Sequence, residues 1–281
     1  MKHLLCFGFG FSAEALAHKL HPHEWHITGT SRSAEGVAAI HANGYEGVLF
    51  SEFNSIPNTV THILTSVPPS DDGDLVLLRF KTELMSRSKS FDWVAYLSTT
   101  GVYGDRGGEW VDENATLQPN TDRGQRRVDA EAEWQSISGL PLEIFRLAGI
   151  YGPGRNAFES LKSGKAQRVI KPGQIFSRIH VEDIAGVLLA SINKPNPGRI
   201  YNLADDEPCP PQDVIAYAAE LLGVPIPPDV AFEDAKLSAM AKSFYADSKR
   251  VSNARIKNEL GYKLKFPNYK IGLKALLTHL D

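Results

Sequence analysis

The chain has 281 residues, of which 42% are hydrophobic, and a formal net charge of −3. This size and composition predict a soluble globular protein, and the lack of basic excess argues against a nucleic-acid partner. The two cysteines, Cys6 and Cys209, form no CxxC pair, so we expect neither a disulfide framework nor a zinc site. No apolar run reaches the ~20 residues of a membrane helix, and the N-terminus does not resemble a signal peptide. We therefore expect no membrane partner and a cytoplasmic location.

Strand-like and helix-like segments alternate from the N-terminus to Gly152. The strand candidates are HLLCFGFG, WHITGTSR, EGVLF, VTHILTSV, DWVAYLSTT and PLEIFRLAGIYG. Between them lie the helix candidates SAEALAHKL, AEGVAAIHANG, DLVLLRFKTELMSRS and TDRGQRRVDAEAEWQSI. This alternation predicts a Rossmann-type, doubly wound α/β fold with a parallel sheet and right-handed helical crossovers.

The pattern changes after Gly152. Residues 153–178 are polar and glycine-rich, and then IHVEDIAGVLLASI and GRIYNLA predict a buried helix and a last strand. From Asp205 the chain is proline-rich, with short helices such as PQDVIAYAAELLG and YKIGLKALLTHL. We predict a Rossmann domain of residues 1–152, rejoined by 179–204, and a smaller, discontinuous substrate domain of residues 153–178 and 205–281.

A glycine loop, Gly8-x-Gly10-x-x-Ala13, joins the first strand to the first helix. In a dinucleotide site the first glycine permits a tight turn, the second lets the backbone approach a pyrophosphate, and the small third residue lets the helix pack closely. The pyrophosphate then lies at the helix N-terminus, here Phe11 and Ser12, where free N–H groups favour an anion. The alternative is a plain turn.

The second strand ends in Ser31-Arg32-Ser33, where an NAD-binding protein has an acidic residue for the ribose hydroxyl. A guanidinium and two hydroxyls suit a 2′-phosphate, so we expect NADP(H) rather than NAD(H). A solvent-facing arginine is the alternative. We also assign Ser66 and Val67, at the end of the fourth strand candidate, to the cofactor site.

Several motifs together resemble those of the extended short-chain dehydrogenase/reductases. These are LSTTGVYGDRGGEWVDE, RLAGIYGPGR, FSRIHVEDIA, YNLADDEP and the closing NARIKNELGYKLKFPNYKIGLKAL, which follow in the expected order over nearly the whole chain. More closely they resemble the NAD(P)-dependent epimerase/dehydratase branch, which acts largely on nucleotide sugars. The glycine loop departs from the pattern, because extended members mostly carry GxxGxxG.

The resemblance also implies where the catalytic residues belong. The family uses a Ser or Thr together with a Tyr-x-x-x-Lys pair, in which the tyrosine exchanges a proton and the lysine holds the nicotinamide ribose. Thr99 matches the Ser/Thr, but Arg123 and Arg127 stand at the positions of the tyrosine and lysine. Arginine stays protonated and does not replace the tyrosine as a proton donor. The chain is therefore identified as an atypical member.

Other residues are candidates for the missing roles. Tyr103 follows the strand whose end faces the nicotinamide, so it is a candidate proton donor, or a structural residue as in the family's own VYG. Tyr151 is expected to be structural, and His180 has either a packing or a catalytic role. No cysteine or paired carboxylate joins the sequence-local histidines His18, His21, His23 and His26, so we expect no metal.

Basic residues lie where the family holds its substrate's phosphates. Arg155, Lys171 and Arg178 occupy this segment and indicate an anionic substrate, unless they are scattered surface charges. Arg127 is expected to hold a ribose or phosphate and Arg123 to face the substrate. The alternative is a solvated helix face balanced by Asp122 and Glu131, with Glu131 pairing with Arg127 at the i,i+4 spacing.

Two functions remain open. One is an NADP-dependent oxidoreductase or epimerase/dehydratase-like enzyme acting on a small or nucleotide-linked substrate. The other is a non-catalytic NADPH-binding sensor or partner-binding protein. A homodimer is compatible with either.

Overall fold

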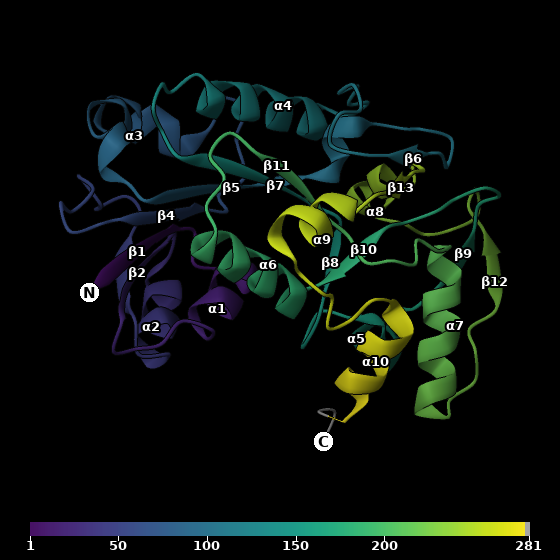
Figure 1. Ribbon diagram of the computed structural model, residues 1–281. Helices are drawn as coiled ribbons and strands as arrows, with labels where there is room; N and C mark the ends of the chain where they lie inside the picture. Colours follow the sequence, from purple (N-terminus) through teal and green to yellow (C-terminus); the bar gives the residue numbers. More distant parts are fainter. Residues whose placement is uncertain (279–281) are drawn as a thin grey trace.

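The structure is a computed structural model and describes residues 1–278. A parallel sheet of seven strands forms the centre of this described part, in the order β11-β7-β5-β4-β1-β2-β3 (Figure 1). Its strands are β1 (Lys2–Phe7), β2 (Trp25–Ser31), β3 (Glu46–Leu49), β4 (His62–Thr65), β5 (Trp93–Thr99), β7 (Leu142–Leu147) and β11 (Ile200–Leu203). The predicted Rossmann-type α/β fold is therefore confirmed. Strand order reverses between β1 and β4, and ligands of such sheets bind beyond the carboxyl ends of the strands at this point.

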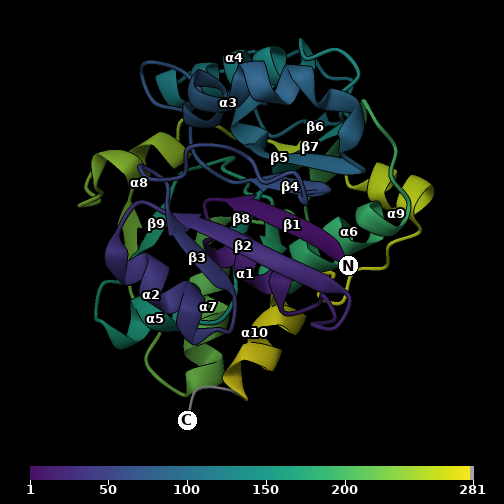
Figure 2. The ribbon, with the colours of Figure 1, turned by 90° about the vertical axis from the view of Figure 1, so that its left-hand side faces the viewer.

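Helices cover both faces of the sheet, because successive strand residues point to opposite sides and both sides are apolar. Leu5 and Phe7 of β1 pack in one cluster with α3 (Leu75–Ser86) and α4 (Asp122–Gln135). Leu4 and Cys6 pack in a second cluster with α1 (Phe11–Ala17) and α6 (Val181–Asn193). The helix α2 (Ala34–Ala42) follows β2. Figure 2 shows the sheet between the α3–α4 layer and the α1–α2 layer.

The remaining elements lie in the centre and on the right of Figure 1. They are β6 (Trp110–Val111) with β13 (Arg250–Val251), β8 (Gly149–Tyr151) with β10 (Arg178–His180), β9 (Arg168–Ile170) with β12 (Asp229–Ala231), and the helices α5 (Ala157–Lys162), α7 (Pro211–Leu222), α8 (Ala239–Phe244), α9 (Ala254–Leu260) and α10 (Tyr269–Leu277). Phe158, Ala218 and Leu273 join α5, α7 and α10 in an apolar cluster separate from those on the sheet.

Two sequence predictions differ from the structure in detail. The segment PLEIFRLAGIYG forms two strands, because after β7 the chain leaves the main sheet and pairs as β8 with β10. The segment IHVEDIAGVLLASI starts as strand β10, and His180 caps α6 by accepting the Glu182 N–H at its Nδ1 (3.2 Å). The predicted last helix forms as α10, while its His279 and Leu280 lie outside the described residues. Within residues 1–278 no helix has the length and apolar character to cross a membrane.

Candidate active site

Glycine is needed for different reasons at the two positions of the loop after β1. Gly8 has a φ of +80°, and a Cβ there would lie 3.0 Å from Ser66 Oγ, so the backbone itself requires glycine. Ser66 Oγ also donates to the Gly8 carbonyl at 2.7 Å. Gly10 has an ordinary φ of −110°, and no heavy atom lies within 4 Å of a Cβ built on it. Nothing in the described fold requires glycine at position 10, whereas close approach of a pyrophosphate to the protein backbone would require it.

The other residues predicted around this loop have definite places. Phe11 and Ser12 begin α1 and line the cleft described below, and Ala13 is fully buried in the cluster between α1 and α6. Val67 packs beside Gly8, outside the cleft lining. The open space over Gly10 and the free N–H groups of the first turn of α1 together fit the pyrophosphate of a dinucleotide.

Arg32 stands at the carboxyl end of β2 with its side chain exposed. No hydrogen-bond or ion-pair partner holds its guanidinium among residues 1–278. The two flanking serines are occupied locally, because Ser33 Oγ caps α2 by accepting the Gly36 N–H (3.2 Å) and Ser31 Oγ accepts the Ser33 N–H (3.3 Å). A free guanidinium at this strand end fits a ribose 2′-phosphate.

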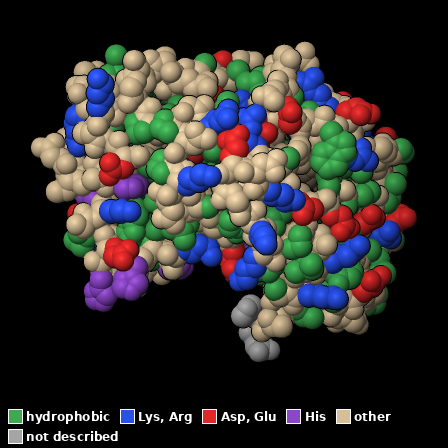
Figure 3. All heavy atoms as spheres, viewed as in Figure 1, with side chains coloured by type: hydrophobic (Ala, Val, Ile, Leu, Met, Phe, Trp, Pro, Cys, Tyr) green, Lys and Arg blue, Asp and Glu red, His purple; other side chains and the backbone are tan. Residues whose placement is uncertain are grey.

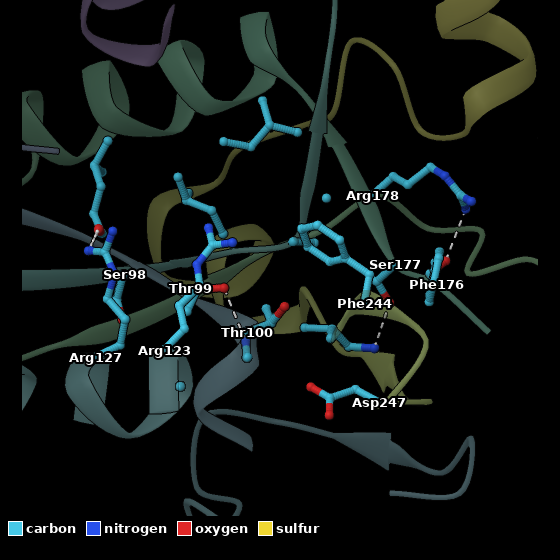
Figure 4. Close-up of a pocket in the computed structure, with 18 of the residues that line it drawn as sticks. Ser98, Thr99, Thr100, Arg123, Arg127, Phe176, Ser177, Arg178, Phe244 and Asp247 are labelled. Carbon is cyan, nitrogen blue, oxygen red and sulfur yellow. Dashed lines mark hydrogen bonds between the residues drawn. The ribbon is translucent and has the colours of Figure 1, made fainter. Parts of the chain in front are cut away.

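A cleft of about 610 Å³ opens at the carboxyl ends of β1, β4 and β5. Figure 4 shows its interior, with side chains from β5, α4, the β10 segment and α8. The cleft brings together nine of the residues predicted from the sequence, Gly10, Phe11, Ser12, Ser66, Thr99, Arg123, Arg127, Arg155 and Arg178. Segments from the two ends of the chain thus share one cavity.

The three arginines at the start of α4 have three different environments. Arg123 lines the cleft, and its guanidinium lies 5.9 Å from the centre of the Phe244 ring (Figure 4). Arg126 forms an ion pair with Asp71 and does not line the cleft. Arg127 lines the cleft but is only 9% exposed. The predicted alternative of a uniformly solvated face is therefore wrong.

Arg127 is fixed by β5. Its Nη1 donates to the Leu97 carbonyl at 2.8 Å and to the Tyr96 hydroxyl at 3.0 Å. Thr99 ends the same strand at the cleft, where its Oγ1 accepts the Gly101 N–H at 3.1 Å. The Thr99 hydroxyl hydrogen remains available to an acceptor in the cleft.

Glu131 does not pair with Arg127, contrary to the i,i+4 prediction. Its carboxylate is 2% exposed and is bound by Arg146 of β7, with Nη2 to Oε2 at 2.6 Å. Ser98 Oγ donates to the other oxygen, Oε1, at 2.5 Å. The register of β5 and β7 places Ser98 beside Arg146, which brings both donors to the helix.

The structure argues against Tyr103 as the replacement proton donor. Its ring is fully buried and does not line the cleft. The hydroxyl donates to Asn202 Oδ1 at 2.7 Å and accepts from Arg146 Nη1 at 3.0 Å. Burial raises the pKa of this hydroxyl, which Arg146 only partly offsets. Tyr103 therefore joins the Glu131–Arg146 network as a structural residue.

Two of the three predicted substrate cations are used within the protein. Lys171 does not line the cleft, because its Nζ donates to the Tyr245 carbonyl. Arg178 lines the cleft, but its Nη1 donates to the Phe176 carbonyl (3.1 Å) and to Cys209 Sγ (3.1 Å). In Figure 4 its guanidinium points away from Arg123. Arg155 is exposed, and within residues 1–278 no carboxylate pairs with it.

His180 and Tyr151 pack against each other with ring centres 5.0 Å apart. His180 is 1% exposed, and burial lowers its pKa to about 4, so it is neutral at physiological pH. Tyr151 borders the cleft, but a Cβ on Gly272 would lie 2.2 Å from its hydroxyl, which is thus enclosed by α10. These placements favour the packing roles.

The sequence did not indicate several residues of the cleft. Phe244, Asp247 and Lys249 come from the C-terminal half, and no local motif marks them. Lys249 is buried, and its Nζ binds Asp247 Oδ2 (2.9 Å) and the Gly104 carbonyl (2.8 Å). Burial lowers the Lys249 pKa, which Asp247 partly offsets. Asp247 is the one carboxylate among the described lining residues, so the cleft is strongly basic.

The histidine-rich end of the molecule lies away from the cleft. Histidine side chains gather at the lower left of Figure 3, at the end where α1 and α2 lie in Figure 1. Strand pairing brings His3, His26 and Glu46 together, with ligand atoms within 4.8 Å of one another, a grouping that the sequence analysis missed. The Thr28 hydroxyl lies among them, 2.8 Å from His3 Nε2 and 2.7 Å from Glu46 Oε2.

Sequence comparisons find relatives that match most of the chain. No family model matches the chain. It is 27% identical to protein YeeZ of Escherichia coli, over 95% of this chain and 97% of that one. It is 25% identical to a 3-diazoavenalumate denitrifying reductase of a Streptomyces species, over 85% of this chain and 86% of that one.

Solved structures match over almost the full length. A functionally unknown conserved protein from Silicibacter pomeroyi is 53% identical, with a TM-score of 0.96 and 99% of both chains covered. A putative NAD-dependent epimerase/dehydratase from Methylobacillus flagellatus is 26% identical, with a TM-score of 0.74 and coverage of 99% and 98%. A human epimerase family protein with NADPH, 15% identical, shares the fold, with a TM-score of 0.71 and coverage of 99% and 100%. The predicted resemblance is confirmed: the chain belongs to one family with the Silicibacter pomeroyi protein, and it has the fold of the NAD-dependent epimerase/dehydratases, extended short-chain dehydrogenase/reductases.

Proposed function

We propose that the protein is an NADPH-dependent reductase of a small anionic substrate. The observation that carries the proposal is the open approach to Gly10, a glycine that the fold does not need, at the edge of a cleft that also holds Arg123 and Thr99. A human structural neighbour is described with NADPH, and a Streptomyces relative is named a reductase. Both support a reductive role for this chain.

The residues present fit the cofactor. Gly8, Gly10 and the first turn of α1 would hold the pyrophosphate, Arg32 the 2′-phosphate, and Ser66 and Arg127 the part of the cofactor that enters the cleft. When bound, NADPH supplies a hydride to the substrate.

The protein's own contribution is electrostatic. Arg123 presents a positive charge in the cleft, and the Thr99 hydroxyl has a hydrogen to donate. Such groups stabilise negative charge that develops on a substrate oxygen. Arg123 donates hydrogen bonds but not a proton, so the proton comes from water, which reaches this open cleft.

NADPH oxidation tests the proposal. Purified protein is mixed with NADPH and a panel of small carbonyl acids and nucleotide sugars, and absorbance of the reduced cofactor is followed. We expect turnover with at least one small acid, and a higher NADPH concentration for half-maximal turnover with Gly10→Ala. The second candidate is a non-catalytic NADPH sensor. Among the described lining residues the one carboxylate, Asp247, is paired with Lys249, the Tyr151 hydroxyl is enclosed, and no histidine is present, which favours this candidate. Tight NADPH binding without turnover on any compound would support that candidate instead.

A further inference from the structure

The cleft contains an unsatisfied pair of positive charges, which bears on the substrate of the proposed function. Arg123 and Arg155 both line the cleft. Burial lowers the pKa of Arg123 most, and the charges of Arg127 and then Arg155 lower it further. Among residues 1–278 neither guanidinium has a carboxylate partner. Like charges in a partly desolvated cleft repel each other, and a bound anion removes this repulsion. The pair is therefore suited to a carboxylate or a phosphate.

A flat apolar surface stands beside this pair. Phe244 of α8 is 52% exposed although it belongs to the cleft lining. The Arg123 guanidinium lies over its ring, and Figure 4 shows both side chains in the same part of the cavity. An exposed aromatic ring in a pocket gains free energy by covering another apolar or aromatic surface. The charge and the ring together select a ligand that has both an acid and a planar ring.

The size of the cleft limits that ligand. Pockets of about 300–1,000 Å³ hold one drug-sized ligand. This cleft of about 610 Å³ must admit the nicotinamide end of the cofactor as well as the substrate. The remaining space is enough for a single-ring compound.

We infer that the substrate is a small planar aromatic acid, whose carboxylate binds Arg123 and Arg155 and whose ring packs on Phe244. This inference rests on the proposed function, because it assumes that the cofactor occupies the Gly10 side of the same cleft.

Calorimetric titration of the NADP⁺-saturated protein tests it. The probes are trans-cinnamate, cyclohexanecarboxylate as the non-planar acid, cinnamyl alcohol as the uncharged ring, and UDP-glucose. We expect cinnamate to bind at least about tenfold more tightly than cinnamyl alcohol, which lacks the charged hydrogen bond, and more tightly than cyclohexanecarboxylate and UDP-glucose, which do not place a planar ring and a carboxylate together. Arg123→Ala, Arg155→Ala and Phe244→Leu should each weaken cinnamate binding by about tenfold while NADP⁺ affinity is unchanged. Arg126→Ala, on the same helix but outside the cleft, is the matched control and should bind cinnamate normally.

Two outcomes overturn the inference: cinnamate binding no tighter than the other probes, or unchanged by the three substitutions. Failure of the proposed function is a separate result, seen as no NADP⁺ binding to the wild type. In that case the same titrations on the free protein still decide whether Arg123, Arg155 and Phe244 bind an aromatic acid.

Discussion

Glu131 of α4 is bound by Arg146 of β7 and not by Arg127, which precedes it by one turn of its own helix. The side chains of Glu131 and Arg146 are nearly fully buried, with exposed fractions of 2% and 3%. Arg146 also donates to Tyr103, so the ion pair connects α4, β7 and the segment after β5. Within residues 1–278 Arg127 therefore forms no ion pair with a carboxylate, and it lies at the base of the cleft.

Glu131→Gln should therefore destabilise the protein by about 3–5 kcal/mol, since it leaves the Arg146 charge buried without a counter-charge. Urea unfolding followed by circular dichroism measures the change. Glu133→Gln is the matched control, because Glu133 pairs with Lys81 at the surface and should contribute at most about 1 kcal/mol. Equal losses in the two variants would contradict a dominant role for the buried pair.

Tyr103→Phe should cost about 1–3 kcal/mol of stability, because Asn202 Oδ1 and one Arg146 N–H lose their buried partner. NADPH affinity should not change, because Tyr103 does not line the cleft. Thermal unfolding and cofactor titration of the same sample check both points. A variant of normal stability with impaired turnover would return Tyr103 to the catalytic role that the sequence left open as one alternative.

Substitutions of the two loop glycines should distinguish an effect on NADPH binding from an effect on stability. Gly10→Ala adds a methyl group where no heavy atom lies within 4 Å, so the melting temperature should stay the same while NADPH affinity falls more than about tenfold. Gly8→Ala should lower both the melting temperature and the NADPH affinity, because a φ of +80° strains alanine by about 1 kcal/mol or more. Differential scanning fluorimetry with and without NADPH distinguishes the two. Normal NADPH affinity in Gly10→Ala would place the cofactor elsewhere.

How much of this site was predictable depends on how local each signal is. The glycine loop and Arg32 are read from consecutive residues between one strand and one helix, so the sequence located them without the fold. The pairing of Glu131 depends instead on the register between β5 and β7, which places Arg146 beside Ser98. A helical spacing rule names Arg127 as the partner, and tertiary packing overrides that rule.

The outer part of the cleft was not predictable for a similar reason. Phe244 and Lys249 reach the cleft from over a hundred residues beyond Thr99, and the weak β6–β13 pairing that guides the chain there involves two residues on each side. The sequence also could not show that Lys171 is unavailable to a substrate, because the Tyr245 carbonyl that binds it belongs to this same C-terminal segment. Only the folded chain shows which basic residues remain free.

Asp205 should make the stability depend on pH. It is 1% exposed, and burial raises its pKa to about 8, more than Arg178 lowers it. Between about pH 4 and pH 8 the unfolded chain has lost this proton while the folded chain keeps it, so the free energy of unfolding falls as pH rises.

Asp205→Asn removes this titration and keeps an oxygen to accept the Glu207 N–H. The stability advantage of the variant over the wild type should grow from about pH 4 to pH 8. Urea midpoints across this range measure it, and the difference between the two proteins separates Asp205 from other titrating groups. Parallel pH profiles would mean that Asp205 is ionised in the folded state throughout.

The most direct test of the central claim is a calorimetric titration of the wild type and Arg32→Ala with NADPH and with NADH. The free Arg32 guanidinium should make the wild type bind NADPH about tenfold to a hundredfold more tightly than NADH, as expected for a charged hydrogen bond of about 1.5–3 kcal/mol. Arg32→Ala should bind both cofactors with the affinity that the wild type has for NADH. Arg199→Ala, an exposed arginine paired with Glu259, is the control and should keep the preference. Equal affinities of the wild type for NADPH and NADH, or no binding of either, would contradict the account.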